Sequence, residues 1–144
     1  MTIRSFKYVE IARLQLQTAV ELFLSETNYI SAITLAGAAE EIFGKMTKPI
    51  GKKNALAQRM ELAESLNEIF TEFKPLSKDD VIKGATRDRN RVKHLDHPKV
   101  AGVIFDDKEA AEDLIERAIE NYEILGQPLS LEMRRFRTIT QNAV

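Results

Sequence analysis

The sequence contains no cysteine among its 144 residues. This absence excludes a disulfide framework, a thiolate nucleophile and any zinc or iron–sulfur site built on cysteine. It fits a reducing compartment, and we expect a cytoplasmic location. The first residues contain no apolar signal segment, because Arg4, Lys7 and Glu10 interrupt them.

Long apolar runs and an excess of charge of one sign are also lacking. The longest apolar stretch, Ala32 to Ala39, is far shorter than the ~18 residues that a membrane-spanning helix requires, so we expect no membrane partner. The 21 basic and 22 acidic residues give a net charge of -1. This balance gives no electrostatic indication of nucleic-acid binding and disfavours a DNA-binding regulator.

Glycine and proline are scarce as well, with 6 and 4 residues, too few for the many turns of an all-β domain. They gather where helical patterns stop, and apolar residues recur with helical spacing almost throughout. The predicted fold class is therefore all-α. We expect one domain over residues 1–144, an up-and-down bundle of about five helices with a short helix or tail over 129–144.

The periodicity also places the individual helices. Asn28 can cap the second, while Ser77 with Asp80 and Asp106 with Glu109 form approximate capping boxes for the fourth and fifth. The apolar stripes of the first two helices are unusually broad, which predicts burial against a second copy of the chain. The five expected ranges are 4–24, 28–49, 54–73, 77–98 and 106–125.

Histidine is rare too, and both histidines, His94 and His97, fall at the end of the fourth expected helix. On a helical projection the polar side chains there form one continuous arc bounded by Arg89 and His94. Imidazole side chains can move protons on and off oxygen, and guanidinium groups match phosphate oxygens and stay charged. An arginine and a histidine on one helical face can therefore cleave phosphodiesters without a metal or other cofactor.

Spacing alone is weak support, because Arg87 also precedes His94, and Arg91 precedes His97, at comparable distances. The combination strengthens the signal. Arg89 is followed directly by the polar Asn90, and Lys93 stands beside His94, so that Asn90 and Lys93 are accessory candidates. In RNA the 2′-hydroxyl supplies an internal nucleophile for such a site.

The segment Arg89-Asn90-Arg91-Val92-Lys93-His94 resembles the motif of HEPN domains (higher eukaryotes and prokaryotes nucleotide-binding). That motif is an arginine, four to six residues and a histidine, with a polar residue directly after the arginine. The stretch from Leu35 to Ile42 also resembles the small-residue, acidic helix that these domains place beside the motif. The resemblance spans residues 9–122.

The resemblance implies a helical bundle that dimerises so that two motifs face each other in a composite site. Many members of this family are metal-independent ribonucleases that leave cyclic phosphate ends, often as toxins or antiviral effectors. Arg89 and His94 would be the catalytic pair, Asn90 an accessory residue and Glu40 a supporting one. Other members only bind, so the alternative is a non-catalytic interaction or nucleotide-binding module. Such a module could pair with a cognate antitoxin or a nucleotidyltransferase.

Simpler interpretations stand beside these. Arg89 and His94 could be a solvated helix end, and Glu40 could make a plain surface salt bridge. His94 and His97 resemble half of a zinc site, but no other histidine and no cysteine completes it, so no metal is expected. The basic tail, with Arg134, Arg135 and Arg137 around Phe136, could touch RNA phosphates or form a solvated helix face.

Overall fold

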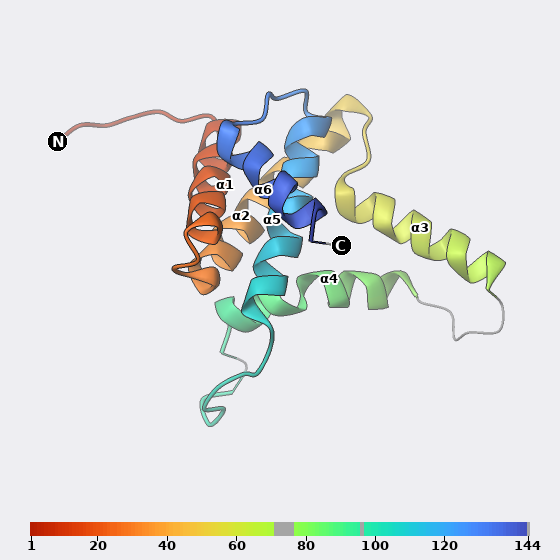
Figure 1. The fold of residues 1–144 in the computed structure, drawn as a ribbon. Helices are drawn as coiled ribbons and strands as arrows, with labels where there is room; N and C mark the ends of the chain where they lie inside the picture. The colour runs from red at the N-terminus through yellow and green to blue at the C-terminus, as the bar shows by residue number, and fades with distance from the viewer. Residues whose placement is uncertain (71–76, 96, 144) are drawn as a thin grey trace.

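A computed structural model describes residues 1–70, 77–95 and 97–143, and these ranges contain helices and no strand. The all-α prediction is confirmed. The described residues form six α-helices and one short 3-10 helix, η1, rather than about five helices (Figure 1). Their bounds are α1 Tyr8–Leu24, α2 Tyr29–Thr47, η1 Lys48–Ile50, α3 Ala55–Ile69, α4 Lys78–Lys93, α5 Asp107–Ile124 and α6 Leu131–Gln141.

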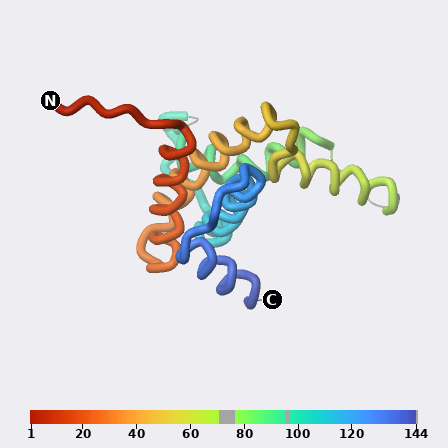
Figure 2. The backbone as a smooth tube through the Cα atoms, turned by 90° about the horizontal axis from the view of Figure 1, so that it is seen from above, coloured from red at the N-terminus to blue at the C-terminus, as the bar shows by residue number. Residues whose placement is uncertain are grey.

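The hydrophobic core lies between α1, α2 and α5, with α6 packed against α1 and α5 (Figures 1 and 2). Small residues line the contact of α2 with α5, and this allows the two backbones to come close. Phe136 of α6 closes one end of the core through an edge-on contact with Phe23, whose ring centroid is 5.0 Å away. The broad apolar stripes of α1 and α2 are thus largely covered inside one chain. The buried apolar residues of α1 and α2 are Ala12, Leu16, Ala19, Val20, Phe23, Ala32, Ile33, Ala36, Ala39 and Phe43.

The local signals at helix starts are confirmed by hydrogen bonds. The side chain of Asn28 accepts one from the Ser31 amide at 2.9 Å, and that of Asp106 accepts one from Glu109 at 2.9 Å. Ser77 and Asp80 form the reciprocal capping box in full. These caps satisfy amides that the first turn of a helix would otherwise leave unpaired.

Helices α3 and α4 pack against each other and project from the core as an arm (Figure 1). Ala55 is the only buried residue of α3, and α4 has none. Leu66 of α3 and Phe70, its C-cap residue, are 43% and 53% exposed. The arm is therefore held by specific polar contacts more than by apolar burial, and the motif lies on it.

Three helix ends differ from the sequence-based expectation. The first helix begins at Tyr8 rather than at residue 4, and residues 1–7 extend away from the body (Figure 1). The third ends at Ile69, and the expected end at Phe73 lies outside the described residues. The fourth ends at Lys93 rather than at Pro98. None of the helices in the described ranges has both the length and the apolarity to cross a bilayer.

Candidate functional site

Two helices meet at the arginine of the motif. Arg89 lies in α4 and its side chain, 19% exposed, turns toward α2. There it passes over Gly37, where a Cβ atom would stand only 2.6 Å from Arg89 Cδ and 2.8 Å from Cγ. The missing side chain at Gly37 therefore makes the space in which the stem of Arg89 lies.

The guanidinium of Arg89 faces two carboxylates of α2. Its Nη1 atom is 3.6 Å from Glu40 Oε2 and 3.8 Å from Glu41 Oε2. Both separations exceed normal hydrogen-bond length, and Arg89 makes no side-chain hydrogen bond to any described residue. The carboxylates hold the charge in place while its N–H donors remain available.

Glu40 is buried, with 6% of the residue exposed, so the prediction of a plain surface salt bridge is wrong. Burial raises the pKa of its carboxyl, and the positive charges of Arg117 and Arg89 oppose that rise. Beside it, Glu41 is partly exposed, and the pKa of its carboxyl is lowered by a hydrogen bond from Lys45. Two neighbouring carboxylates of one helix thus carry shifts of opposite sign.

Arg117 of α5 also lies beside Glu40, and its place in this group of charged side chains was not predicted from the sequence. Its side chain is 1% exposed, and its Nε atom lies 3.7 Å from Glu40 Oε1 without a hydrogen-bond partner. Nη1 pairs with Asp113 Oδ2 at 2.5 Å, and Nη2 donates to the backbone oxygen of Ala85 at 2.7 Å. Arg117 therefore ties α4 to the core and places a second cation behind Glu40.

Asn121 of α5 is a second residue that the sequence analysis missed, and it is completely buried. Its Oδ1 atom accepts from the Ala55 amide at 2.7 Å, and its Nδ2 atom donates to the Glu40 carbonyl at 3.2 Å. One side chain thus joins α2 to the start of α3. Arg117 and Asn121 were detectable, since both interrupt the apolar stripe of α5 at core positions.

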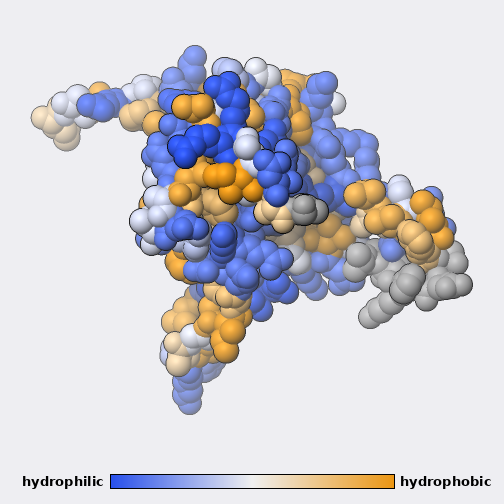
Figure 3. Space-filling view, in the orientation of Figure 1, coloured by the Kyte–Doolittle hydropathy of each residue, from blue (hydrophilic) through white to orange (hydrophobic). Residues whose placement is uncertain are grey.

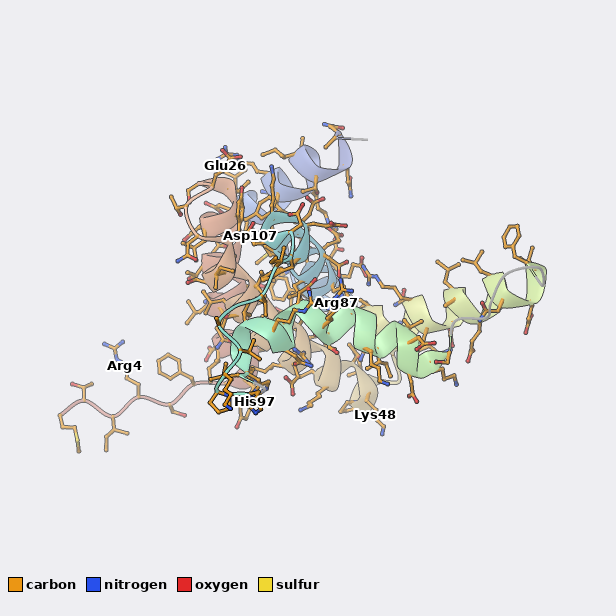
Figure 4. The ribbon with its side chains drawn as sticks, turned by 90° about the horizontal axis from the view of Figure 1, so that it is seen from below. Arg4, Glu26, Lys48, Arg87, His97 and Asp107 are labelled. Atoms are coloured by element: carbon orange, nitrogen blue, oxygen red, sulfur yellow. The ribbon has the colours of Figure 1, made fainter. Side chains whose placement is uncertain are left out.

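The structure also separates the three arginines that could have paired with a histidine. Arg87 and Arg91 both contact Asp88 at 3.4 Å, and their side chains are 59% and 36% exposed. Figure 4 labels Arg87 on α4. Only Arg89 among the three contacts the buried Glu40, and this favours the spacing with four residues before His94.

His94 follows directly after α4 as its C-cap residue, in extended conformation with φ -125° and ψ 135°. It is exposed, and no hydrogen bond or ion pair joins its side chain to Arg89 or to any other described residue. Asn90 is exposed on the same helix, and Lys93 is exposed at its last turn. Within one subunit, His94 and Arg89 therefore lie near the same end of α4, but their side chains do not form a hydrogen bond with each other.

His97 has a different position, in a turn beyond the helix. Its Nδ1 atom accepts a hydrogen bond from the Lys99 amide at 3.2 Å, and its carbonyl accepts one from Val100 at 3.0 Å. The fourth helix, expected to reach residue 98, therefore ends before His97, and the helical projection does not apply beyond Lys93. Within the described ranges no group of three or more metal-ligating side chains comes together.

Two hollows open on either side of Arg89. One, of about 550 Å³, lies toward η1 and α3, and the other, of about 320 Å³, lies along α2 between Thr34 and Lys45. Arg89, Glu41 and Lys45 line both, and Lys93 lines the smaller one. The guanidinium is therefore reachable by a ligand from two directions.

The basic tail divides between a structural and an exposed part. Arg137 pairs with Glu116 at 2.9 Å and with Glu123 at 2.7 Å, which fastens α6 to α5, and these two carboxylates raise the pKa of Arg137 against the opposing effect of its burial. Arg134 and Arg135 are exposed.

No protein-family model, curated protein or solved structure matches this chain. A guanidinium with available donors, held over a buried carboxylate, can bind and neutralise an oxyanion. An exposed imidazole near the same helix end can transfer a proton.

Proposed function

We propose that the protein is a metal-independent endoribonuclease of the HEPN type, with a composite site formed by two copies of the chain. The main support for this proposal is the position and hydrogen bonding of the Arg89 side chain. Its ion pairs with the carboxylates of Glu40 and Glu41 fix the position of the guanidinium, yet its N–H donors make no hydrogen bond to a described residue. Arg117, by contrast, donates hydrogen bonds from Nη1 to Asp113 and from Nη2 to the Ala85 carbonyl.

In the proposed reaction the 2′-oxygen of a ribose attacks the adjacent phosphorus, and the bond from phosphorus to the 5′-oxygen breaks. His94 acts as general base on the 2′-hydroxyl or as general acid on the leaving oxygen. Arg89 stabilises the negative charge that develops on the phosphorane oxygens. The products are a 2′,3′-cyclic phosphate and a free 5′-hydroxyl, and no metal enters the step.

The supporting residues follow from their contacts. Glu40 positions Arg89, while Asn90 and Lys93 stand exposed on the motif helix, where they could contact the scissile or a neighbouring phosphate. A partner copy would bring a second motif opposite the first. The biological role that fits such an enzyme is that of a toxin or an antiviral defence component.

The decisive experiment measures single-turnover cleavage of a structured RNA in EDTA. His94→Ala and Arg89→Ala should each lower the rate about 10²–10⁴-fold, the usual effect of losing a proton-transfer group or a charge-stabilising one. His97→Ala is the matched control, because that imidazole serves the turn at Lys99 and should affect stability only. Circular dichroism checks the fold of each variant.

Equal cleavage by wild type and His94→Ala would reject the nuclease. So would activity that vanishes on chelation and returns with magnesium, because the described residues provide no cluster of metal ligands.

A second candidate function is a non-catalytic binding module. The ion pairs of Arg89 with Glu40 and Glu41 favour it, since they already offset the charge that catalysis would use. This candidate predicts wild-type protein that binds RNA, a nucleotide or a protein partner such as a nucleotidyltransferase without cleaving RNA in either EDTA or magnesium.

A further inference from the structure

A cleft beside Arg89 is lined by residues of α2, η1, α3 and α4. It has a volume of about 550 Å³ and lies between the end of α2, η1 and the facing parts of α3 and α4. Figure 4 labels Lys48, on its rim, and His97, both in the lower part of the view. Ligand sites in proteins commonly have ~300–1,000 Å³, so the cleft can hold a ligand larger than a simple ion.

The lining of this cleft, which we call the lysine cleft, is unusually basic. Five cationic and two acidic side chains contribute to it, in a chain whose overall charge is -1. The chain as a whole has no excess of positive charge, but the lining of this cleft does, and it can attract an anion there. The charged residues are Lys45, Lys48, Lys52, Lys53 and Arg89 on the basic side, and Glu40 and Glu41 on the acidic side.

Some of this charge is balanced within the protein. Lys45 bonds to Glu41 at 2.9 Å, and Lys53 pairs with Glu61. Lys48 and Lys52 form no salt bridge to any carboxylate of the described residues. These two ammonium groups supply the unbalanced charge of the cleft.

The backbone fixes both of these lysines. The chain turns sharply after α2, with Gly51 in the left-handed region at φ 69° and its amide bonded to the Lys48 carbonyl at 3.0 Å. The Lys52 amide bonds to the carbonyl of Thr47 at 3.0 Å. Pro49 restricts the same turn further. A bound anion therefore has to order only the lysine side chains, which reduces the entropic cost of binding.

Arg89 supplies the specificity of the lysine cleft. Its planar guanidinium can donate two parallel hydrogen bonds to one phosphate, a geometry that a lysine cannot provide. Because Arg89 also lines the second hollow, a chain of phosphates could cross it from one hollow to the other.

We propose that the lysine cleft binds phosphate groups, carried either by a single-stranded RNA or by a free nucleotide. Lys48 and Lys52 attract the anion, and Arg89 orients it. The proposal needs neither His94 nor a cleavage step, so it goes beyond the nuclease function and can fail or stand separately from it.

The test measures binding of two fluorescent probes to the full chain. One is a ten-residue 2′-O-methyl RNA, which binds as RNA does but lacks the 2′-hydroxyl nucleophile, and the other is a labelled ATP. The variant Lys48→Glu/Lys52→Glu is compared with Lys83→Glu/Lys99→Glu, which changes the charge equally at exposed lysines outside both hollows. Lys48→Gln/Lys52→Gln repeats the test in case the first variant does not fold.

We expect the cleft variant to bind at least one probe about tenfold more weakly, with the control variant close to wild type. For RNA, the slope of log Kd against log salt should decrease by about 1.4, the value for two lost phosphate contacts on a single strand. Loss confined to the oligonucleotide assigns the phosphates to RNA, and loss confined to ATP assigns them to a nucleotide.

Equal weakening by the cleft and control variants would overturn the proposal, because it would reduce the effect to net charge. The absence of wild-type binding to either probe would overturn it as well. If the wild type cleaves RNA and the cleft variant binds both probes normally, the nuclease proposal stands and phosphate binding by the lysine cleft is refuted. If the cleft variant binds more weakly and the wild type does not cleave RNA, phosphate binding by the lysine cleft stands and the nuclease proposal is refuted.

Discussion

At the scale of single residues, Glu40 organises the site because it faces two arginines from two other helices. Arg117 approaches one of its oxygens to 3.7 Å and Arg89 the other to 3.6 Å. Breaking such a buried cluster by removing one member leaves charge uncompensated, whereas the intact cluster can be close to neutral for stability. Its value lies in fixing where Arg89 points.

The pH dependence of stability tests this environment directly. Burial raises the pKa of the Glu40 carboxyl, so the folded state holds that proton more tightly than the unfolded state does. The stability that results is present below the unfolded pKa and is lost as the pH rises through the folded pKa. The free energy of unfolding of wild type minus that of Glu40→Gln should therefore fall as the pH rises above the ordinary glutamate pKa of 4.5, by up to ~1.4 kcal/mol for each pH unit of pKa shift.

Glu41→Gln is the matched control, since the pKa of Glu41 is lowered by the hydrogen bond from Lys45. The corresponding difference for Glu41 should rise with pH, because its contribution is present above the unfolded pKa and is lost on acidification. Urea unfolding at several pH values measures both. Differences of the same sign for the two variants would contradict the assigned environments.

The sequence predicted the residues of the motif but not what holds them. Arg89 and Glu40 were found as candidates, because one belongs to a spacing pattern and the other lies in a stretch that resembles the acidic helix of HEPN domains. Arg117 and Asn121 were not, since their contacts with Ala85 and Ala55 join residues far apart in the chain. Such long-range polar contacts leave no periodic trace, and only their placement on a core stripe could have indicated them.

At the scale of elements, helix starts were more predictable than helix ends. A cap such as Ser77 with Asp80 is a local hydrogen-bond pattern, and its residues are visible in the sequence. The end of α4 at Lys93 has no such signal, because the nearest helix breaker is Pro98. The turn at His97 sets the path instead, through bonds from the amides of Lys99 and Val100.

The arm of α3 and α4 should be the less stable part of the fold. Ala55 is the only buried residue in the two helices, and the bond from Arg117 to Ala85 is a principal polar tie to α5. Segments with few buried contacts open at lower free energy than the core does. Hydrogen exchange followed by NMR should therefore show amides of α3 and α4 exchanging well before those of α1, α2 and α5. Equal protection across these five helices would contradict the prediction.

At the scale of the whole molecule, the exposed apolar surface differs from the one that the sequence predicted, which was on the first two helices. The stripes of α1 and α2 are largely buried within the chain. Exposed apolar side chains form one group on α3 and another after the motif, where Leu95 is 70% and Ile104 99% exposed. Figure 3 shows this hydrophobic segment below the body of the molecule. A surface of this kind next to His94 is suited to contact with a second copy.

The composite-site proposal therefore predicts a homodimer whose contact includes this segment. Light scattering at micromolar concentration should give twice the chain mass of 16.4 kDa for the wild type. Ile104→Asp should shift the protein toward a monomer and lower RNA cleavage in parallel, because a charge buried in an apolar contact is strongly unfavourable. Leu62→Asp is the control, since Leu62 is also well exposed, at 60%, but lies on α3 and not in this segment. A monomeric wild type would remove the composite site, and with it the reason for expecting His94 of one copy to work beside the motif of another.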